Sequence, residues 1–210
     1  MRILISAATL FLLCAATAAA IDCTDDDESD LPPTPIIINF ENGSYRLTGA
    51  ESPVTFDFYG TGDSLRMGWT AADTDQAFLC LDRNGSGTIE NGTEFFGNAT
   101  PLSGGRRAGN GFKALLAFDD NHDLLIDAQD AIWTELLLWR DRNHDAVSQF
   151  EEISHLDTSG VTAISLEYHW TGRVDPTGNA LRYQSKVWIA EADKRATPRP
   201  LYDVYFVSLM

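Results

Sequence analysis

Three short segments of this sequence carry oxygen-bearing side chains at alternate positions, and this spacing restricts the fold more than any other feature. They begin at Asp82, Asp119 and Asp141. Each has Asp at position one, Asn at position three and Ser or Asp at position five, followed by an acid at position twelve or, in the first segment, thirteen. A calcium ion takes about six to eight oxygen ligands, and a tightly wound loop turns alternate side chains inward. The spacing therefore predicts EF-hand-like calcium (Ca²⁺) loops.

Each loop would supply side-chain oxygens from positions one, three and five, a main-chain carbonyl from position seven and a closing acid. The predicted ligands of the first loop are Asp82, Asn84, Ser86, the Thr88 carbonyl, Glu90 and Glu94. Those of the second are Asp119, Asn121, Asp123, the Leu125 carbonyl and Asp130, with Asp127 acting through water. Those of the third are Asp141, Asn143, Asp145, the Val147 carbonyl and Glu152, with Gln149 acting through water.

Position six of such a loop makes a sharp turn, usually with positive φ. The first loop has Gly87 there, whereas the others have Leu124 and Ala146, for which a left-handed backbone costs about 1–2 kcal/mol. The second loop offsets part of this cost with four carboxylates, although it closes on a short Asp. We expect the first and third loops to be the most specific sites, with the second close behind. His122 and His144, at position four, are expected to point to solvent.

The rest of the chain alternates between short β-like segments and apolar stripes of helical spacing. Candidate strands cover residues 36–40, 45–47, 54–58, 78–81, 161–169, 181–189 and 202–209, with a turn at 175–179. Helical stripes are predicted in residues 112–118 and 132–139. Residues 130–139 would form the helix leaving the second loop and leading into the third. The predicted fold class is therefore α+β, with EF-hand-like calcium loops and short helices flanked by β-hairpins.

The N-terminus predicts export. Arg2 precedes an apolar stretch and a run of small residues, so residues 1–20 are interpreted as a signal peptide. Residues 21–35, acidic and rich in proline, are interpreted as a linker, and residues 36–210 as the calcium-binding domain. The protein would be secreted or periplasmic. In that compartment Cys23 and Cys80 can form a disulfide, but a buried free Cys80 thiol is equally natural in its apolar surroundings.

The net charge and the sequence motifs argue against several classes of function. The net charge of −16, from 31 acidic and 15 basic residues, argues against nucleic acid or anionic membranes as partners, and the apolar N-terminal run is too short to span a bilayer. No catalytic motif is present, so we expect no enzyme. The leading hypothesis is an exported non-enzymatic protein whose calcium ions stabilise its fold or an interaction surface for an extracellular protein or glycan. The alternative is an exported hydrolase or adhesion module that uses calcium structurally, with a polar pocket away from the loops.

The sequence also resembles a known family. Residues 78–98, which include the first loop, resemble a motif of bacterial secreted EF-hand-like calcium-binding proteins and of regions accompanying haemolysin-type calcium-binding proteins. The similarity continues through residues 110–115, 138–145 and 178–183. The resemblance implies calcium binding rather than a particular biological task. Members of that family often carry further acidic loops earlier in the chain; here residues 39–44 and 57–63 are degenerate and are interpreted as turns without metal.

Overall fold

The computed structural model describes residue 32, residues 34–193 and residues 195–209. The predicted signal peptide, most of the predicted linker and Cys23 lie outside this part. Its strands are β1 (Ile36–Asn39), β2 (Val54–Phe56), β3 (Leu65–Met67), β4 (Gln76–Cys80), β5 (Leu125–Ile126), β6 (Leu137–Trp139), β7 (Ile153–His155), β8 (Val161–Ser165), β9 (His169–Val174), β10 (Ala180–Ala190), β11 (Ala196–Tyr205) and β12 (Ser208–Leu209). The α-helix is α1 (Gly111–Leu115), and short 3-10 helices lie at Gly92–Glu94, Ser103–Gly105, Leu116–Phe118, Ala131–Thr134, Phe150–Glu152 and Leu156–Thr158.

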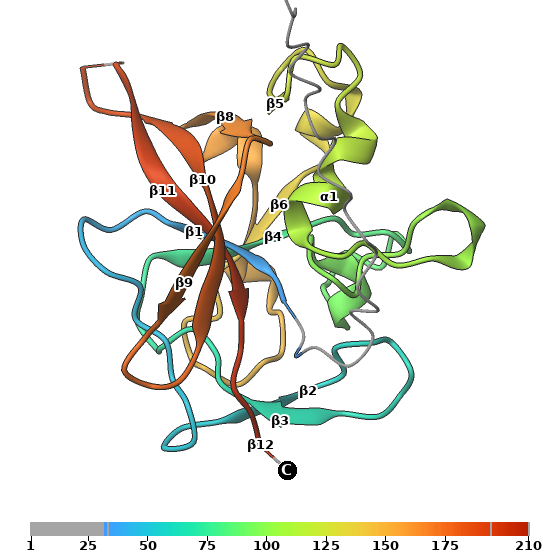
Figure 1. The fold of residues 1–210 in the computed structure, drawn as a ribbon, viewed down its shortest axis with the longest axis vertical. Coiled ribbons are helices and arrows are strands. Elements are labelled where there is room, and N and C mark those ends of the chain that lie inside the picture. Colours follow the sequence, from blue (N-terminus) through green and yellow to red (C-terminus); the bar gives the residue numbers. More distant parts are fainter. Residues whose placement is uncertain (1–31, 33, 194, 210) are drawn as a thin grey trace, which may run out of the picture.

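One antiparallel sheet dominates the molecule. Its strand order is β5-β8-β10-β11-β1-β4-β6-β7, with β9 paired to β10, and it curls into a half-barrel (Figure 1). A small sheet of order β12-β3-β2 lies at the lower end of the view, and α1 lies beside the large sheet. None of the helices in the described residues is long and apolar enough to cross a membrane.

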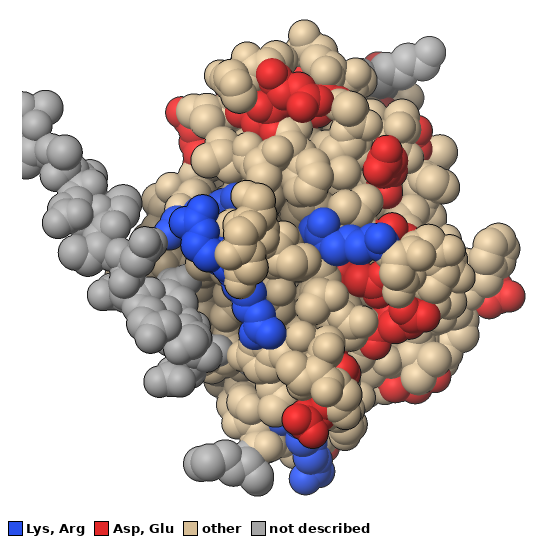
Figure 2. All heavy atoms as spheres, turned by 90° about the vertical axis from the view of Figure 1, so that its right-hand side faces the viewer, with Lys and Arg blue, Asp and Glu red and all other residues tan. Residues whose placement is uncertain are grey.

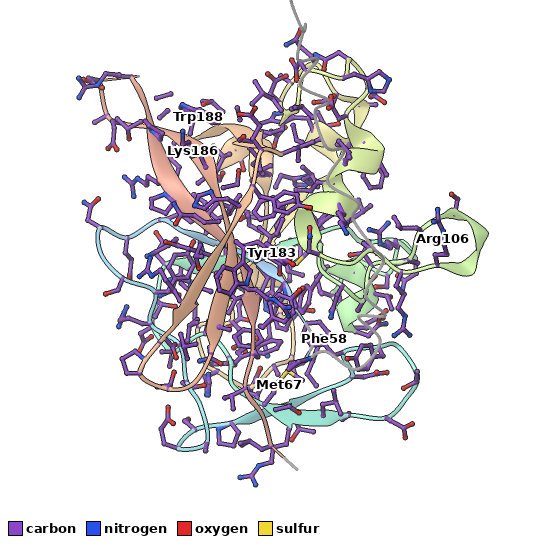
Figure 3. The ribbon with its side chains drawn as sticks, in the orientation of Figure 1. Phe58, Met67, Arg106, Tyr183, Lys186 and Trp188 are labelled. Carbon is purple, nitrogen blue, oxygen red and sulfur yellow. The ribbon has the colours of Figure 1, made fainter. Side chains whose placement is uncertain are left out.

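The central strands are buried on both faces, because each face carries its own apolar cluster. Every residue of β1 and β4 is buried. One face packs α1 and the aliphatic side chains of β8 and β10. The other face holds what we call the aromatic cluster, which also contains apolar residues such as Cys80, Ile89 and Ala146. Its buried rings are Phe56, Phe58, Trp69, Phe78, Phe95, Trp139, Tyr202 and Phe206. Within it Phe78 stacks on Phe95 with ring centroids 5.0 Å apart, and Phe58 and Met67 point inward from the lower part of the molecule (Figure 3).

The predicted α+β class is wrong, because the fold is mostly β. The helix expected over residues 130–139 is a single 3-10 turn followed by strand β6. Leu138 belongs to the face that packs against α1, β8 and β10, which we call the aliphatic face, and Trp139 belongs to the aromatic cluster. A strand buried on both faces is a continuous apolar run, which spacing alone does not distinguish from a buried helix. The third loop therefore follows a strand, and the helix–loop–helix arrangement is lost.

The other helical stripe is partly right. Residues 112–118 form the short α1 followed by the 3-10 turn Leu116–Phe118. Most predicted strands are present, and residues 175–179 form a turn, which lies between β9 and β10. Segment 45–47 contributes only an isolated bridge between Leu47 and Thr70.

The start of the domain is fixed to the segment that follows the first loop. The Thr34 N–H donates to Asn98 Oδ1, and the Asn98 N–H donates to Thr34 Oγ1, each at 3.0 Å. Between these bonds a Cβ atom on Gly97 would lie 1.4 Å from the Thr34 carbonyl oxygen. Only glycine fits at this crossing.

We predict that Gly97→Ala lowers the free energy of unfolding by more than ~3 kcal/mol, because the new methyl group collides with main chain rather than with a movable side chain. Urea denaturation would measure the loss. The exposed Ser103→Ala is the control and should change stability by less than ~0.5 kcal/mol. Equal stability of the two variants would contradict this packing.

Candidate metal sites

The three predicted loops are placed by three different elements. Loop 1 (82–94) follows β4, loop 2 (119–130) follows the 3-10 turn Leu116–Phe118, and loop 3 (141–152) follows β6. On the face shown in Figure 2, acidic side chains gather in patches at the top and along one side, while Lys and Arg lie across the centre. The top is the end of the molecule where β5, which belongs to loop 2, is labelled in Figure 1.

The loops share one backbone conformation despite their different surroundings. Positions four and six have positive φ in all three: Gly85 and Gly87, His122 and Leu124, His144 and Ala146, with φ between 57° and 81°. The positive φ expected at position six is therefore present even where the residue is not glycine. Non-glycine residues rarely adopt this region, so the loop interactions have to hold it in place.

The carboxylate at position one holds that turn. Asp82 accepts the N–H groups of Ser86 and Gly87 at 3.1 and 2.8 Å. Asp119 accepts the equivalent N–H groups, at positions five and six, at 3.2 and 3.0 Å, and Asp141 does so at 3.2 and 2.8 Å. The Asn at position three also accepts the N–H of position five in every loop.

The closing acid returns to the beginning of its loop. Glu94, Asp130 and Glu152 each accept the N–H of position two, at 3.3, 2.9 and 2.8 Å. All three are buried, with 2%, 4% and 8% of their surface exposed. Glu94 makes this contact although it stands at position thirteen, so its extra residue is absorbed without loss of the closing geometry.

None of these buried acids forms an ion pair with a cationic side chain, although the charge of Glu94 partly opposes the lowering of the Arg83 pKa by burial. The ion pairs among the described residues join Arg46 to Glu41, Arg140 to Asp75 and Arg199 to Glu191, and none includes a predicted ligand. Burial raises the pKa of Glu94, although the N–H groups of Glu90 and Arg83 partly oppose the shift. Burial likewise raises the pKa of Asp141, against the N–H groups of Ala146 and Trp69. Both ionised carboxylates would be stabilised by a nearby cation.

The donor set fits a hard divalent ion. Each loop offers carboxylate, amide or hydroxyl, and carbonyl oxygens, and oxygen is the ligand that calcium prefers. As placed, the acids of the described residues are not gathered in groups of three that could hold an ion by themselves. Their oxygens accept main-chain N–H groups instead, so an ion in any loop would also need the neutral oxygens.

Two buried tryptophans connect loop 3 to the aromatic cluster. The Trp69 indole N–H donates to Asp141 Oδ2 at 2.8 Å, and the Trp139 indole N–H donates to Glu152 Oε2 at 3.1 Å. The first and last acids of the loop are thus bonded to the core. Sequence reasoning missed both contacts, because neither indole is marked by the spacing of the loop residues.

The expectation that position four points to solvent is wrong for His144. Its Nδ1 lies 2.7 Å from the Thr70 carbonyl oxygen, and its Nε2 lies 2.9 Å from that of Ser52. His144 therefore ties loop 3 to the segments on either side of β2 and β3. His122, in loop 2, is exposed as expected.

The two degenerate loops differ from each other. In residues 39–44 the one acid, Glu41, pairs with Arg46 at 2.7 Å. In residues 57–63 Asp57 accepts the N–H groups of Thr61 and Gly62, as the position-one acids do in loops 1 to 3. That segment keeps the turn, but no acid stands at position twelve or thirteen.

The sequence matches the SPM domain family over residues 36–206. The chain belongs to the SPM domain family. A stretch of 129 residues is 37% identical to the iron-regulated protein FrpA of Neisseria meningitidis serogroup C. That stretch covers 61% of this chain and 11% of FrpA, so the chain spans only a small part of that relative. Neither name states a ligand.

The SPM domain also has a hollow of about 220 Å³ away from the three loops. It is lined by the 39–45 segment and by residues of β9, β10 and β11, including Arg173, Arg199 and Tyr202. Much of its polar lining is already engaged: Arg199 pairs with Glu191, and Arg173 donates to the Tyr202 hydroxyl.

Cys80, the free thiol of the described residues, is buried in the aromatic cluster, and burial raises its pKa well above the ordinary value.

The strained turn of loop 2 gives a prediction for the SPM domain without metal. Leu124 has φ of 64° and is 43% exposed, so Leu124→Gly should raise the free energy of unfolding by about 1 kcal/mol. Leu116 is the control, since it is 49% exposed but has φ of −57°. Leu116→Gly should lower stability by about 1 kcal/mol. Chemical denaturation in the presence of a chelator measures both, and a loss of stability in Leu124→Gly would contradict the strain.

Proposed function

We propose that this chain is an exported, non-enzymatic calcium-binding protein with up to three EF-hand-like sites, whose ions stabilise the fold or an interaction surface. The observation that carries the proposal is the buried closing acid, which returns to position two in each of three loops that follow different elements. Ordinary turns need a position-one acceptor. They do not need a second buried carboxylate that forms no ion pair with a cationic side chain.

The ligands would be those that the spacing predicts. Each loop would supply oxygens from positions one, three and five, from the position-seven carbonyl and from the closing acid. The ion would supply positive charge to carboxylates whose burial otherwise disfavours their ionised form. In loop 3 the side chain of Gln149, expected to act through water, donates to Asp145 at 3.0 Å. It would have to release that bond to orient a water molecule.

An affinity of about 10⁻⁴–10⁻³ M is enough for ions with a structural role outside the cell. An ion that binds only the folded chain stabilises it by mass action. Export itself is proposed from the leader-like pattern of residues 1–20. An extracellular protein or glycan is the partner class that an exported surface of this kind would meet.

The alternative is an exported hydrolase or adhesion module that uses calcium structurally. The hollow bounded by β9, β10 and β11 favours it, because polar groups line a concave surface away from the loops. The polar groups of its lining include Glu41, Ser44 and Tyr45.

Calorimetric titration of the purified protein with calcium and with magnesium tests the proposal. Calcium should bind with measurable heat, and magnesium more weakly, because magnesium demands a stricter octahedral shell. At a calcium concentration 100 times the dissociation constant, each occupied site should add about 2.7 kcal/mol to stability, which corresponds to a rise in Tm of ~5–10 °C.

Single substitutions assign the heat to individual loops. Asp82→Ala, Asp119→Ala and Asp141→Ala should each reduce the number of ions bound. The control Asp157→Ala, an exposed acid outside the loops, should leave the titration unchanged. Identical melting with and without calcium, together with no heat of binding, would overturn calcium binding altogether.

Tryptophan fluorescence should report calcium binding at loop 3 in particular. Calcium should change the emission of the buried indoles that donate to Asp141 and Glu152. Asp141→Ala should abolish the calcium-dependent part of this change, whereas Asp119→Ala should preserve it. Trp69→Phe should reduce its amplitude. A calcium response that persists in Asp141→Ala would mean that the indoles sense something other than loop 3.

A further inference from the structure

A single serine joins loop 1 to loop 3. The Ile89 N–H donates to Ser148 Oγ at 2.7 Å, and the Ser148 hydroxyl donates to the Ile89 carbonyl oxygen at 3.0 Å. Both residues are buried, with 2% and 7% of their surface exposed. Ile89 is the eighth residue of loop 1, and Ser148 is the eighth residue of loop 3. The two loops therefore meet at equivalent positions.

The sheet brings these midpoints together. Strands β4 and β6 pair antiparallel, with Phe78 opposite Trp139 and Cys80 opposite Leu137, so the two loops begin at opposite ends of the strand pair. Both then run over the same face of the sheet. Ile89 of loop 1 and Ala146 of loop 3 belong to the aromatic cluster, so the bridge lies against a packed surface.

Loop 2 is different. Its eighth residue, Ile126, lies in β5 and pairs with Ile164 of β8. The neighbouring Leu166 N–H donates to the Leu124 carbonyl oxygen at 2.9 Å. Position eight of loop 2 is thus fixed to an ordinary strand of the sheet and to the aliphatic face, not to another loop.

We propose that loops 1 and 3 bind their ions as one coupled pair, that Ser148 is the positioning residue of this pair, and that loop 2 binds independently. The inference rests on the proposed calcium binding. The residues beside the bridge are predicted ligands: Thr88 and Glu90 flank Ile89, and Val147 and Gln149 flank Ser148. An ion that orders one loop therefore fixes the main chain from which the other loop presents its position-seven carbonyl. The second ion then meets a loop that is already partly ordered, which gives positive cooperativity.

Reciprocity gives the sharpest test. Calorimetry should show that Asp141→Ala weakens calcium binding at loop 1 and that Asp82→Ala weakens binding at loop 3 by the same factor, because coupling between two sites is mutual. We expect at least about fivefold, the lower end of typical couplings. Asp119→Ala, in loop 2, should leave both of the other affinities unchanged.

The bridge itself is tested by Ser148→Ala, with Ser148→Thr as the variant that keeps the hydroxyl. Ser148→Ala should abolish the mutual effect of Asp82→Ala and Asp141→Ala, and Ser148→Thr should retain it. The matched control is Ser185→Ala, which removes another buried hydroxyl that donates to the main-chain carbonyls of Ser165 and Glu167. This control should not change the coupling.

Amide hydrogen exchange of the metal-free protein tests the hydrogen bonds between Ile89 and Ser148 without calcium. Ile89 should lose protection in Ser148→Ala and keep it in Ser185→Ala; full protection in both would overturn the bridge. If calcium binds but Asp82→Ala and Asp141→Ala leave each other's sites untouched, the coupling is wrong and calcium binding stands. If calcium does not bind the unaltered protein, both proposals fail.

Discussion

The loops depend on one interaction, the acceptance of main-chain N–H groups by buried or half-buried carboxylates. Asp119 and Asp141 each accept at least two such groups from their own turn, Asp82 accepts three, and a second acid closes each loop from the other side. A hydrogen bond to an ionised acceptor is roughly twice as strong as a neutral one. Such bonds can hold positive φ at His122, Leu124, His144 and Ala146, where the side chains oppose it. They leave a net negative charge in a partly dry site, and a divalent cation is the natural complement.

The sheet decides how this local charge affects the whole molecule. Loops 1 and 3 lie over the aromatic cluster, and the indoles of Trp69 and Trp139 join the end acids of loop 3 to the centre of that cluster. A change of charge at Asp141 is therefore felt by rings that pack against β4 and β6. Loop 2 is anchored through β5 to the opposite, aliphatic face. Loops 1 and 3 thus pack against one apolar cluster and loop 2 packs against the other, although all three loops have the same turn conformation.

Sequence reasoning located the loops but not the scaffold. Alternate oxygen donors fix the turn locally, so positive φ at position six could be predicted from the loop spacing alone, even where the residue is Leu124 or Ala146. The helix expected over residues 130–139 failed because β6 is buried on both faces, and a strand in that setting loses its period of two. The role of Ser148 was missed and His144 was wrongly expected to point to solvent, because their partners, Ile89 and Thr70, lie 59 and 74 residues away. Such contacts follow from sheet register, which the loop pattern does not contain.

The degenerate loops separate turn chemistry from ion chemistry. Residues 57–63 show that the turn stands without a closing acid, since Asp57 accepts the N–H groups of Thr61 and Gly62 and φ is positive at Gly60 and Gly62. The turn alone therefore carries no argument for an ion. In residues 39–44 the guanidinium of Arg46 provides positive charge to Glu41, and that pairing lowers the pKa of Glu41. No described acid of loops 1 to 3 forms such an ion pair, although the Arg83 guanidinium interacts electrostatically with Glu94. The closing carboxylate, buried and outside any ion pair, is what distinguishes a candidate calcium site from a turn of the same shape.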